Sequence, residues 1–311
     1  MQMGDKKRVA IIDLGTNTFH LLISEIDNGN TLIVYKKKQY VKLASNGIFN
    51  INDNAFSRGL ETMQNFKQAI DSYGVSQTYA FGTAALRTAS NSADFIEKVY
   101  EATGITISVI QGEKEADYIW KGARQAVGFG EEKVLIMDIG GGSVEFVIAN
   151  QQAVFWKKSF PIGASVLKNV YHKVDPISLE SRILLNQYLD DVLKPMVEVA
   201  NDYDLKTLVG ASGTFDTLVA LKKASDNASN GNVKTANLIC KNWFTKFTED
   251  LLESTQRKRL QMPGMEAQRA EMMVVATIMV DFVVKKLELE NIVQSTYALK
   301  QGALWSLIYE N

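Results

Sequence analysis

One short phrase occurs twice in this chain, and its residue types suit the binding of phosphate. Residues 9–23 read VAIIDLGTNTFHLLI and residues 134–148 read VLIMDIGGGSVEFVI. Each copy is an apolar run that ends in an aspartate, followed by a glycine-rich bend, a small hydroxyl residue and a second apolar run. At a shift of 125 positions, Asp13 coincides with Asp138. Each copy therefore predicts a β-hairpin with a phosphate-binding turn and a carboxylate beside it.

The two bends are rich in groups that can donate hydrogen bonds to an anion. Glycines let the backbone approach a ligand closely, and successive backbone N–H groups in such a turn form an anion-binding concavity. The candidate phosphate ligands are Gly15, Thr16, Asn17 and Thr18 in the first bend and Gly140, Gly141, Gly142 and Ser143 in the second. We interpret Asp13 and Asp138 as ligands of a Mg²⁺ ion between carboxylate and phosphate, directly or through water. The alternative is two ordinary hairpins, but two copies in the same order favour a phosphate site in a shared cleft.

A third glycine turn is a weaker candidate for phosphate binding. Residues 208–217 read LVGASGTFDT, between a predicted strand and a predicted helix. The candidate ligands are Gly210, Ser212, Gly213 and Thr214. They can bind phosphate at the helix N-terminus, or they can be plain helix-capping residues.

Several further side chains could take part in catalysis. Glu113 and Glu115 stand at the start of a predicted helix, where a carboxylate could be a general base for a water molecule, or could have the structural role of stabilising the helix through its dipole. Arg87 follows a strand end and could hold phosphate oxygens, or it could be a surface arginine in an early helical turn. Glu145 shares a strand face with Ser143, so it could hold a metal or orient water. Its alternative is a polar residue that points outward from a half-buried strand.

Composition limits the classes of function. The chain has 311 residues with 46% apolar and 22% charged residues, which is typical of a soluble enzyme with two domains. The net charge of −1 gives no global attraction for nucleic acid or anionic membranes. Basic clusters at Lys36–Lys38, Lys157–Lys158 and Arg257–Arg259 are more typical of solvated faces than of a polyanion track.

Cysteine and histidine are scarce, which restricts the kinds of metal site. Cys240 is the single cysteine, and His20 and His172 are the two histidines, so we expect no disulfide within the chain and no zinc site. The start of the chain lacks the features of a signal peptide, and the apolar stretch Met272–Val284 is too short to span a membrane. We therefore expect a cytoplasmic protein without a membrane partner.

The periodicity of apolar residues predicts an α/β protein. Strands are expected at 9–23, 31–43, 77–82, 105–110, 134–138, 143–149, 152–160, 206–209 and 291–294, and helices at 53–73, 91–103, 111–127, 163–171, 178–198, 214–223, 242–253, 265–287 and 297–309. A loop that contains Arg87 is expected after the strand at 77–82, and the polar segment 224–236 is also expected to be a loop. We predict domains at 1–126 and 127–311 with a hinge at 124–132, and we expect the last helix to return to the first domain.

Taken together, these motifs resemble the exopolyphosphatase/guanosine pentaphosphate phosphohydrolase family, which belongs to the actin-like ATPase and sugar-kinase superfamily. The matching phrases are DLGTNTFHLLI (13–23), GTAALRTASN (82–91), QGEKEA (111–116), DIGGGSVEF (138–146), GASGT (210–214) and PGMEAQRA (263–270). They occur in the order of the family and cover the chain nearly from end to end.

The resemblance implies two ribonuclease-H-like domains around a cleft, and hydrolysis of a terminal phosphoanhydride with Mg²⁺. It implies that Glu115 is the catalytic base, that Asp138 is the metal-associated carboxylate with Asp13 opposite, and that Glu145 and Arg87 lie in the cleft. The implied substrate is inorganic polyphosphate, with guanosine pentaphosphate as the nearest alternative. A sugar kinase and a non-catalytic polyphosphate or nucleotide sensor are further alternatives.

The chain departs from the family pattern at two places. Where the family commonly has an Arg-Glu-Gly step, this chain has Lys300, Gln301 and Gly302. It also ends at residue 311, without the additional helical part of long members. Chain-length preference, processivity and a homodimer are therefore left open by the resemblance.

Overall fold

The computed structural model describes residues 6–226 and 234–310. The chain divides into two compact units: unit 1 comprises Met1–Glu115 and Ala303–Asn311, and unit 2 comprises Ala116–Gly302. The division falls near the start of helix α4 (Gly112–Val127), whereas the sequence placed it at the end of that helix. Most of the last helix, α12 (Leu299–Tyr309), is grouped with unit 1. Its Tyr309 hydroxyl donates a 2.9 Å hydrogen bond to the carbonyl oxygen of Gly29.

Unit 1 contains a five-stranded mixed sheet in the order β3-β2-β1-β4-β5. Its strands are β1 (Lys7–Leu14), β2 (Thr18–Asp27), β3 (Asn30–Tyr40), β4 (Gln77–Gly82) and β5 (Ile107–Val109). The apolar strand β1 is central, antiparallel to β2 and parallel to β4. Because β1, β4 and β5 run in the same direction, the residues that follow their carboxyl ends meet at one edge of the sheet.

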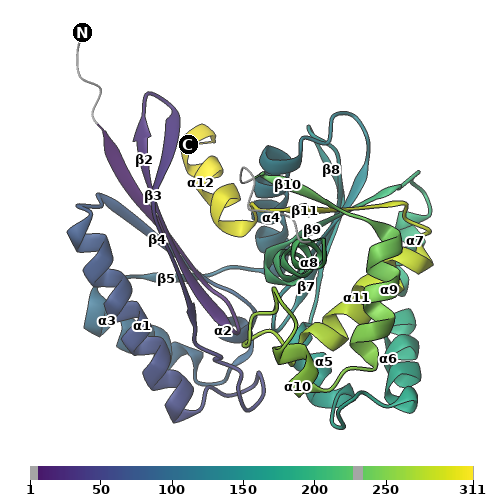
Figure 1. Cartoon of the computed structure of the whole chain (residues 1–311). Helices are drawn as coiled ribbons and strands as arrows, with labels where there is room; N and C mark the ends of the chain where they lie inside the picture. The colour runs from purple at the N-terminus through teal and green to yellow at the C-terminus, as the bar shows by residue number, and fades with distance from the viewer. Residues whose placement is uncertain (1–5, 227–233, 311) are drawn as a thin grey trace. The chain divides into compact units, whose positions relative to one another are not determined.

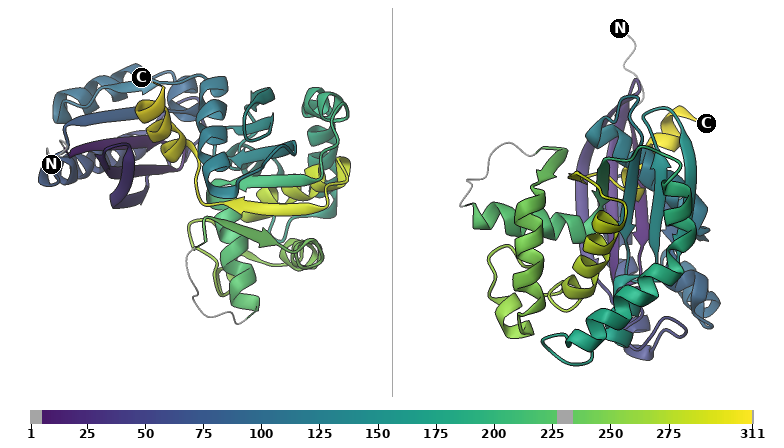
Figure 2. Two further views of the ribbon diagram at one scale, coloured as in Figure 1. Left: turned by 90° about the horizontal axis from the view of Figure 1, so that it is seen from above. Right: turned by 90° about the vertical axis from the view of Figure 1, so that its right-hand side faces the viewer.

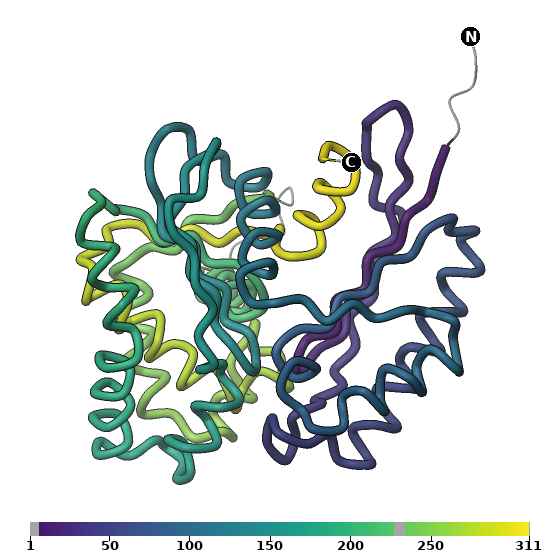
Figure 3. The backbone as a smooth tube through the Cα atoms, turned by 180° about the vertical axis from the view of Figure 1, so that it is seen from behind, coloured from purple at the N-terminus to yellow at the C-terminus, as the bar shows by residue number. Residues whose placement is uncertain are grey.

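Helices α1 (Asp53–Ser72) and α3 (Ser92–Thr103) cover one face of this sheet (Figures 1 and 3). Helix α1 begins after Asn52, whose side chain accepts a hydrogen bond from the backbone N–H of Ala55. A Cβ atom on Gly59 would lie 2.8 Å from the ring of Phe95, so this glycine permits the close approach of α3. The segment around Arg87 that follows β4 was predicted to be a loop, but it contains the short helix α2 (Ala84–Thr88).

Unit 2 repeats the strand pattern of unit 1 in a six-stranded sheet with the order β10-β11-β9-β6-β7-β8. Its strands are β6 (Val134–Ile139), β7 (Val144–Ala149), β8 (Val154–Phe160), β9 (Thr207–Ala211), β10 (Ala236–Ile239) and β11 (Asn291–Ser295). In both sheets three antiparallel strands are followed by two strands parallel to the first, and unit 2 adds the antiparallel edge strand β10. The predicted α/β class with two ribonuclease-H-like sheets is therefore confirmed. The edge strand β10 was not predicted.

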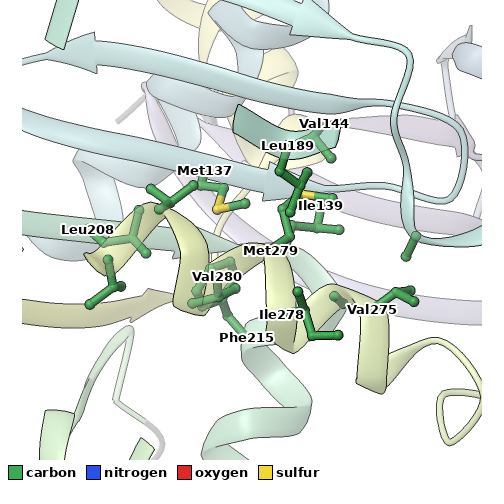
Figure 4. Close-up of a cluster of buried hydrophobic side chains, with 14 of the residues drawn as sticks. Met137, Ile139, Val144, Leu189, Leu208, Phe215, Val275, Ile278, Met279 and Val280 are labelled. Carbon is green, nitrogen blue, oxygen red and sulfur yellow. The ribbon is translucent and has the colours of Figure 1, made fainter. Parts of the chain in front are cut away.

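The core of unit 2 is built around helix α11. Besides α4, the helices are α5 (Ala164–Tyr171), α6 (Leu179–Val192), α7 (Lys194–Ala200), α8 (Ser212–Ser225), α9 (Lys241–Leu252), α10 (Gln256–Leu260) and α11 (Met273–Lys286). Helix α11 lies against α5, α6 and α9 (Figure 2). Its Met279 and Val280 are fully buried beneath the sheet, near Met137 and Phe215 (Figure 4). The apolar stretch Met272–Val284 thus forms a buried helix, and no described helix is long and apolar enough to cross a bilayer.

Several predicted boundaries in unit 2 were wrong. The single helix expected at 178–198 is divided at Leu193 into α6 and α7, and Pro195 lies in the first turn of α7. The helix expected at 265–287 begins only at Met273, because the preceding residues form successive turns after Gly264, whose φ is +93°. Residues 227–233 of the predicted loop 224–236 lie outside the described part of the chain.

The interpretation of Arg257–Arg259 as a solvated basic face was wrong for Arg259. This residue is only 1% exposed and lies in α10, a helix that was not predicted. Its guanidinium donates hydrogen bonds to the carbonyl oxygens of Ala270 (2.8 Å) and Ser254 (2.5 Å), and to Oδ1 of Asp175 (2.7 Å). Arg259 therefore ties three segments of unit 2 together.

Candidate active site

The first glycine turn follows the carboxyl end of β1 in unit 1. The backbone N–H of Gly15 donates a 3.1 Å hydrogen bond to the carbonyl oxygen of Thr18, which closes the turn. A Cβ atom on Gly15 would lie 2.9 Å from that same oxygen, so the turn requires glycine at this position. The side chains of Thr16 and Thr18 are buried, whereas Asn17 and Asp13 are half-buried.

The second glycine turn, after β6 in unit 2, has the same geometry. The backbone N–H of Gly140 donates a 2.9 Å hydrogen bond to the carbonyl oxygen of Ser143. A Cβ atom on Gly140 would also lie 2.9 Å from the carbonyl oxygen of Ser143. The repeated sequence phrase thus encodes a repeated closed turn, and Asp13 and Asp138 each lie two positions before the glycine that closes it.

A neighbouring segment holds each turn at the same position. In unit 1 the carbonyl oxygen of Thr16 accepts a 2.8 Å hydrogen bond from the N–H of Leu43, just after β3. In unit 2 the carbonyl oxygen of Gly141 accepts a 3.0 Å hydrogen bond from the N–H of Ser165, after β8. A Cβ atom on Gly163 would lie 2.3 Å from the Gly141 backbone, so this glycine permits the contact. Both turns are consequently held by backbone hydrogen bonds from a neighbouring segment.

Arg87 and Glu115, which are 28 positions apart, form an ion pair in unit 1. Nη1 of Arg87 lies 2.7 Å from Oε2 of Glu115 and also donates a 2.8 Å hydrogen bond to the carbonyl oxygen of Ile110. Arg87 projects from α2 after β4, and Glu115 from the first turn of α4 after β5. Both side chains are largely buried. The parallel strands β4 and β5 thus bring a guanidinium and a carboxylate together at one edge of the sheet.

Glu145 is a buried carboxylate that accepts two hydroxyl hydrogen bonds. Its Oε1 lies 2.7 Å from Oγ of Ser143 and 2.7 Å from Oγ of Ser159. Only 1% of Glu145 is exposed, so it does not point outward from a half-buried strand. Ser159 was not identified from the sequence, because only the pairing of β7 with β8 brings it opposite Glu145.

Asp138 is linked to the third glycine turn. The hydroxyl of Ser212 donates a 2.7 Å hydrogen bond to Oδ2 of Asp138. Ser212 begins α8 and has a φ of +65°, a conformation that favours glycine. A strained backbone at a polar residue next to a buried carboxylate is typical of functional sites.

The glycines of the third turn have packing roles of their own. A Cβ atom on Gly210 would lie 2.0 Å from the ring of Phe215, and one on Gly213 would lie 1.7 Å from Nη2 of Arg269. The Arg269 guanidinium therefore lies directly on the first turn of α8, where Thr214 is buried. Arg269 lies in the phrase PGMEAQRA, and no role was predicted for it, since no periodicity places this segment beside α8.

The residues fit a magnesium ion that takes part of its coordination from substrate and water. Among residues 6–226 and 234–310, no group of three or more His, Cys, Asp or Glu side chains could hold a metal. Mg²⁺ is commonly bound through one or two carboxylates, with substrate phosphates and water as the remaining ligands. Asp13 in unit 1 and Asp138 in unit 2 each lie beside a closed turn, so each can supply a carboxylate of this kind.

Comparison with known proteins gives concordant matches. The model of the Ppx/GppA phosphatase family matches residues 22–310. An exopolyphosphatase from Cytophaga hutchinsonii, solved by crystallography, is 37% identical and superposes with a TM-score of 0.93, covering 97% of this chain and 98% of that one. This likeness extends over both units.

Two curated proteins are more distant relatives. Exopolyphosphatase 1 of Mycobacterium tuberculosis is 26% identical over 301 residues, which are 96% of this chain and 87% of that protein. A bifunctional 3-dehydroquinate synthase/phosphatase of Fusobacterium nucleatum is 29% identical over 284 residues. That match covers 86% of this chain but only 42% of the bifunctional protein, so the chain spans less than half of that relative's length.

Proposed function

Since this chain belongs to the Ppx/GppA phosphatase family, we propose that it is an exopolyphosphatase. In this proposal it hydrolyses the terminal phosphoanhydride bond of inorganic polyphosphate and releases orthophosphate in a reaction that depends on Mg²⁺. The sequence expectation that the two glycine turns serve one substrate is part of the proposal.

The observation that carries the proposal is the recurrence of one closed glycine turn beside an aspartate in both units. Gly15 and Gly140 make the same hydrogen bond to the residue three positions later, and both would clash with that residue's carbonyl oxygen if they carried a Cβ atom. A rigid turn with backbone N–H groups is suited to the oxygens of phosphate. Two such turns in one chain support a substrate with more than one phosphate group.

The Arg87–Glu115 ion pair supports the catalytic roles that we assign to these residues. Glu115 orients a water molecule and accepts its proton as the water attacks the terminal phosphorus atom. Arg87 contributes a positive charge to the oxygens of the transferring group. Before substrate binds, each side chain neutralises the other at 2.7 Å, which limits the cost of burying both charges.

Asp138 and Asp13 are the residues that would hold Mg²⁺. When bound, this ion offsets the negative charge that develops on the phosphate oxygens. The hydrogen bond from Ser212 fixes one oxygen of Asp138. Catalysis would then rest on positioning and electrostatics, as is general for phosphoryl transfer.

The names of two relatives favour polyphosphate over guanosine pentaphosphate as the substrate. The Cytophaga hutchinsonii and Mycobacterium tuberculosis proteins are both exopolyphosphatases. Both candidate substrates end in a phosphoanhydride, and in this proposal the turns bind only that end. The substrate must therefore be decided by direct comparison.

The test is an orthophosphate-release assay with the full chain. Polyphosphates of several lengths and guanosine pentaphosphate would be supplied at equal concentrations of terminal phosphate, with Mg²⁺ or with EDTA. We expect release from polyphosphate with Mg²⁺ and none with EDTA. Faster release from the nucleotide would replace polyphosphate as the substrate. Binding without release would support a sensor, and transfer of phosphate from ATP to a sugar would support a kinase.

A further inference from the structure

A row of polar side chains crosses three adjacent strands behind the second glycine turn. Asp138 on β6 is the register partner of Glu145 on β7, and Glu145 is the register partner of Ser159 on β8. Directly opposed residues in antiparallel strands project from the same face of the sheet. Ser143, two positions before Glu145, is on the same face. The sheet register therefore brings these side chains together.

The two hydrogen bonds of Glu145 have the same direction. The hydroxyls of Ser143 and Ser159 both donate to its Oε1, each at 2.7 Å. A serine hydroxyl has a single proton and two lone pairs. The hydroxyl proton of Ser143 therefore lies in the hydrogen bond to Glu145, and the oxygen lone pairs of Ser143 point away from that carboxylate.

The first turn shows that a buried acid is not needed to close such a turn. The position equivalent to Glu145 in unit 1 is His20, which is the register partner of Asp13. The Gly15–Thr18 turn nevertheless closes with a 3.1 Å hydrogen bond. Burying a carboxylate is costly unless its hydrogen bonds are satisfied. Its presence in unit 2 is therefore explained better by what it does to Ser143 than by the folding of the turn.

We infer that Ser159 is a positioning residue, which acts through Glu145 on the hydroxyl of Ser143. With its proton held by Glu145, Ser143 meets the ligand as an acceptor, through its lone pairs, and not as a donor to phosphate. This orientation suits a cation, a water molecule or an N–H donor at that position. Ser159 is needed because a second donor fixes the carboxylate in the rotamer that reaches Ser143.

The inference rests on the proposed function, and a set of variants of the full chain tests it. Ser159→Ala removes the second donor, whereas Ser159→Thr keeps a hydroxyl and suits a β-strand. Ser76→Ala is the matched control, because that exposed hydroxyl donates to the carbonyl oxygen of Arg8 in unit 1. With polyphosphate and Mg²⁺, we expect Ser159→Ala to lower kcat about tenfold, with little change in KM. Ser159→Thr should restore most of the rate, and Ser76→Ala should match the wild type.

A double-mutant cycle separates positioning from general damage. If Ser159 acts only through Glu145, Ser159→Ala should have no further effect on kcat in a Glu145→Gln background. Multiplicative losses, or an unchanged kcat in Ser159→Ala, would overturn the inference.

A second readout does not depend on activity. In urea unfolding, the stability losses of Ser159→Ala and Glu145→Gln should be non-additive, because both substitutions affect one hydrogen bond. An inactive wild type with non-additive stability losses would overturn the proposed function but leave the Ser159–Glu145 contact supported. Additive losses would overturn the contact itself.

Discussion

Ser212 donates a 2.7 Å hydrogen bond to Oδ2 of Asp138 while its own backbone has a φ of +65°. For a residue with a Cβ atom, this left-handed conformation costs roughly 1–2 kcal/mol. Glycine would remove the strain but would also remove the hydroxyl. The strained serine thus makes a hydrogen bond to Asp138 that a glycine with a relaxed backbone could not make.

Substitutions at Ser212 should separate backbone strain from the hydroxyl contact. Ser212→Gly and Ser212→Ala both remove the hydrogen bond to Asp138, but only glycine relieves the strain. We expect Ser212→Gly to be more stable than Ser212→Ala by about 1 kcal/mol in urea unfolding. Both variants should lose phosphate release to a similar extent. Equal stabilities would argue against strain at this residue, and a fully active Ser212→Gly would show that the hydroxyl is dispensable.

The assignment of Glu115 as general base has a matched control two residues away, in the same helical turn. Glu115→Gln keeps the shape of the side chain but cannot accept a proton, so phosphate release should fall by roughly 10²–10⁴. Glu113 is in the same first turn of α4 but is exposed, and Glu113→Gln should retain the wild-type rate. Both variants would be assayed with polyphosphate and Mg²⁺. A Glu115→Gln protein with the full rate would refute the assignment.

Local sequence signals were sufficient to predict the glycine turns and the central strands. The apolar runs before Asp13 and Asp138 become β1 and β6, each with neighbouring strands on both sides. The bends between the apolar runs become closed turns because only glycine tolerates the close carbonyl oxygen. These features depend on residues that are close together in the sequence, so periodicity and residue type are enough to find them.

Contacts between distant segments could not be predicted in the same way. The Arg87–Glu115 pair depends on the parallel order of β1, β4 and β5, which no local pattern specifies. Arg259 was assigned to solvent because it stands in a run of basic residues. Its burial follows from acceptors that only the fold brings to it, on Ser254, Ala270 and Asp175.

The contact between Gly213 and Arg269 predicts a further coupling. Gly213→Ala would place its Cβ atom 1.7 Å from Nη2 of Arg269, so the guanidinium must move away from the first turn of α8. If Arg269 contributes to the site from this position, Gly213→Ala and Arg269→Ala should each lower phosphate release. The double variant should then be no slower than the slower single variant. Multiplicative losses would indicate that the two residues act separately.

The last prediction concerns pH and a buried histidine in unit 2. The side chain of His172 is 4% exposed, and its Nδ1 has no hydrogen-bond partner among the residues that the structure describes. Burial, reinforced by the positive charge of Arg259, lowers the pKa of His172, although its 3.1 Å contact with Asp175 opposes this shift. Because the pKa of His172 is lower in the folded state, the folded state binds fewer protons than the unfolded chain as this histidine titrates. The free energy of unfolding is therefore retained above about pH 6.5, the pKa of histidine in the unfolded chain, and is lost as the pH falls below it.

A His172→Gln variant should isolate this effect. Between pH 7.5 and pH 5.5, the wild type should lose unfolding free energy relative to His172→Gln, by at most about 1.4 kcal/mol per pH unit. Burial tends to raise the pKa of Asp175, but hydrogen bonds from the backbone of Gln256 and from Arg259 outweigh it and lower that pKa. The contribution of Asp175 is thus lost only in stronger acid, below about pH 3.9, outside the measured window. Parallel stability curves for the two proteins would contradict the prediction, because the slope would then arise from groups other than His172.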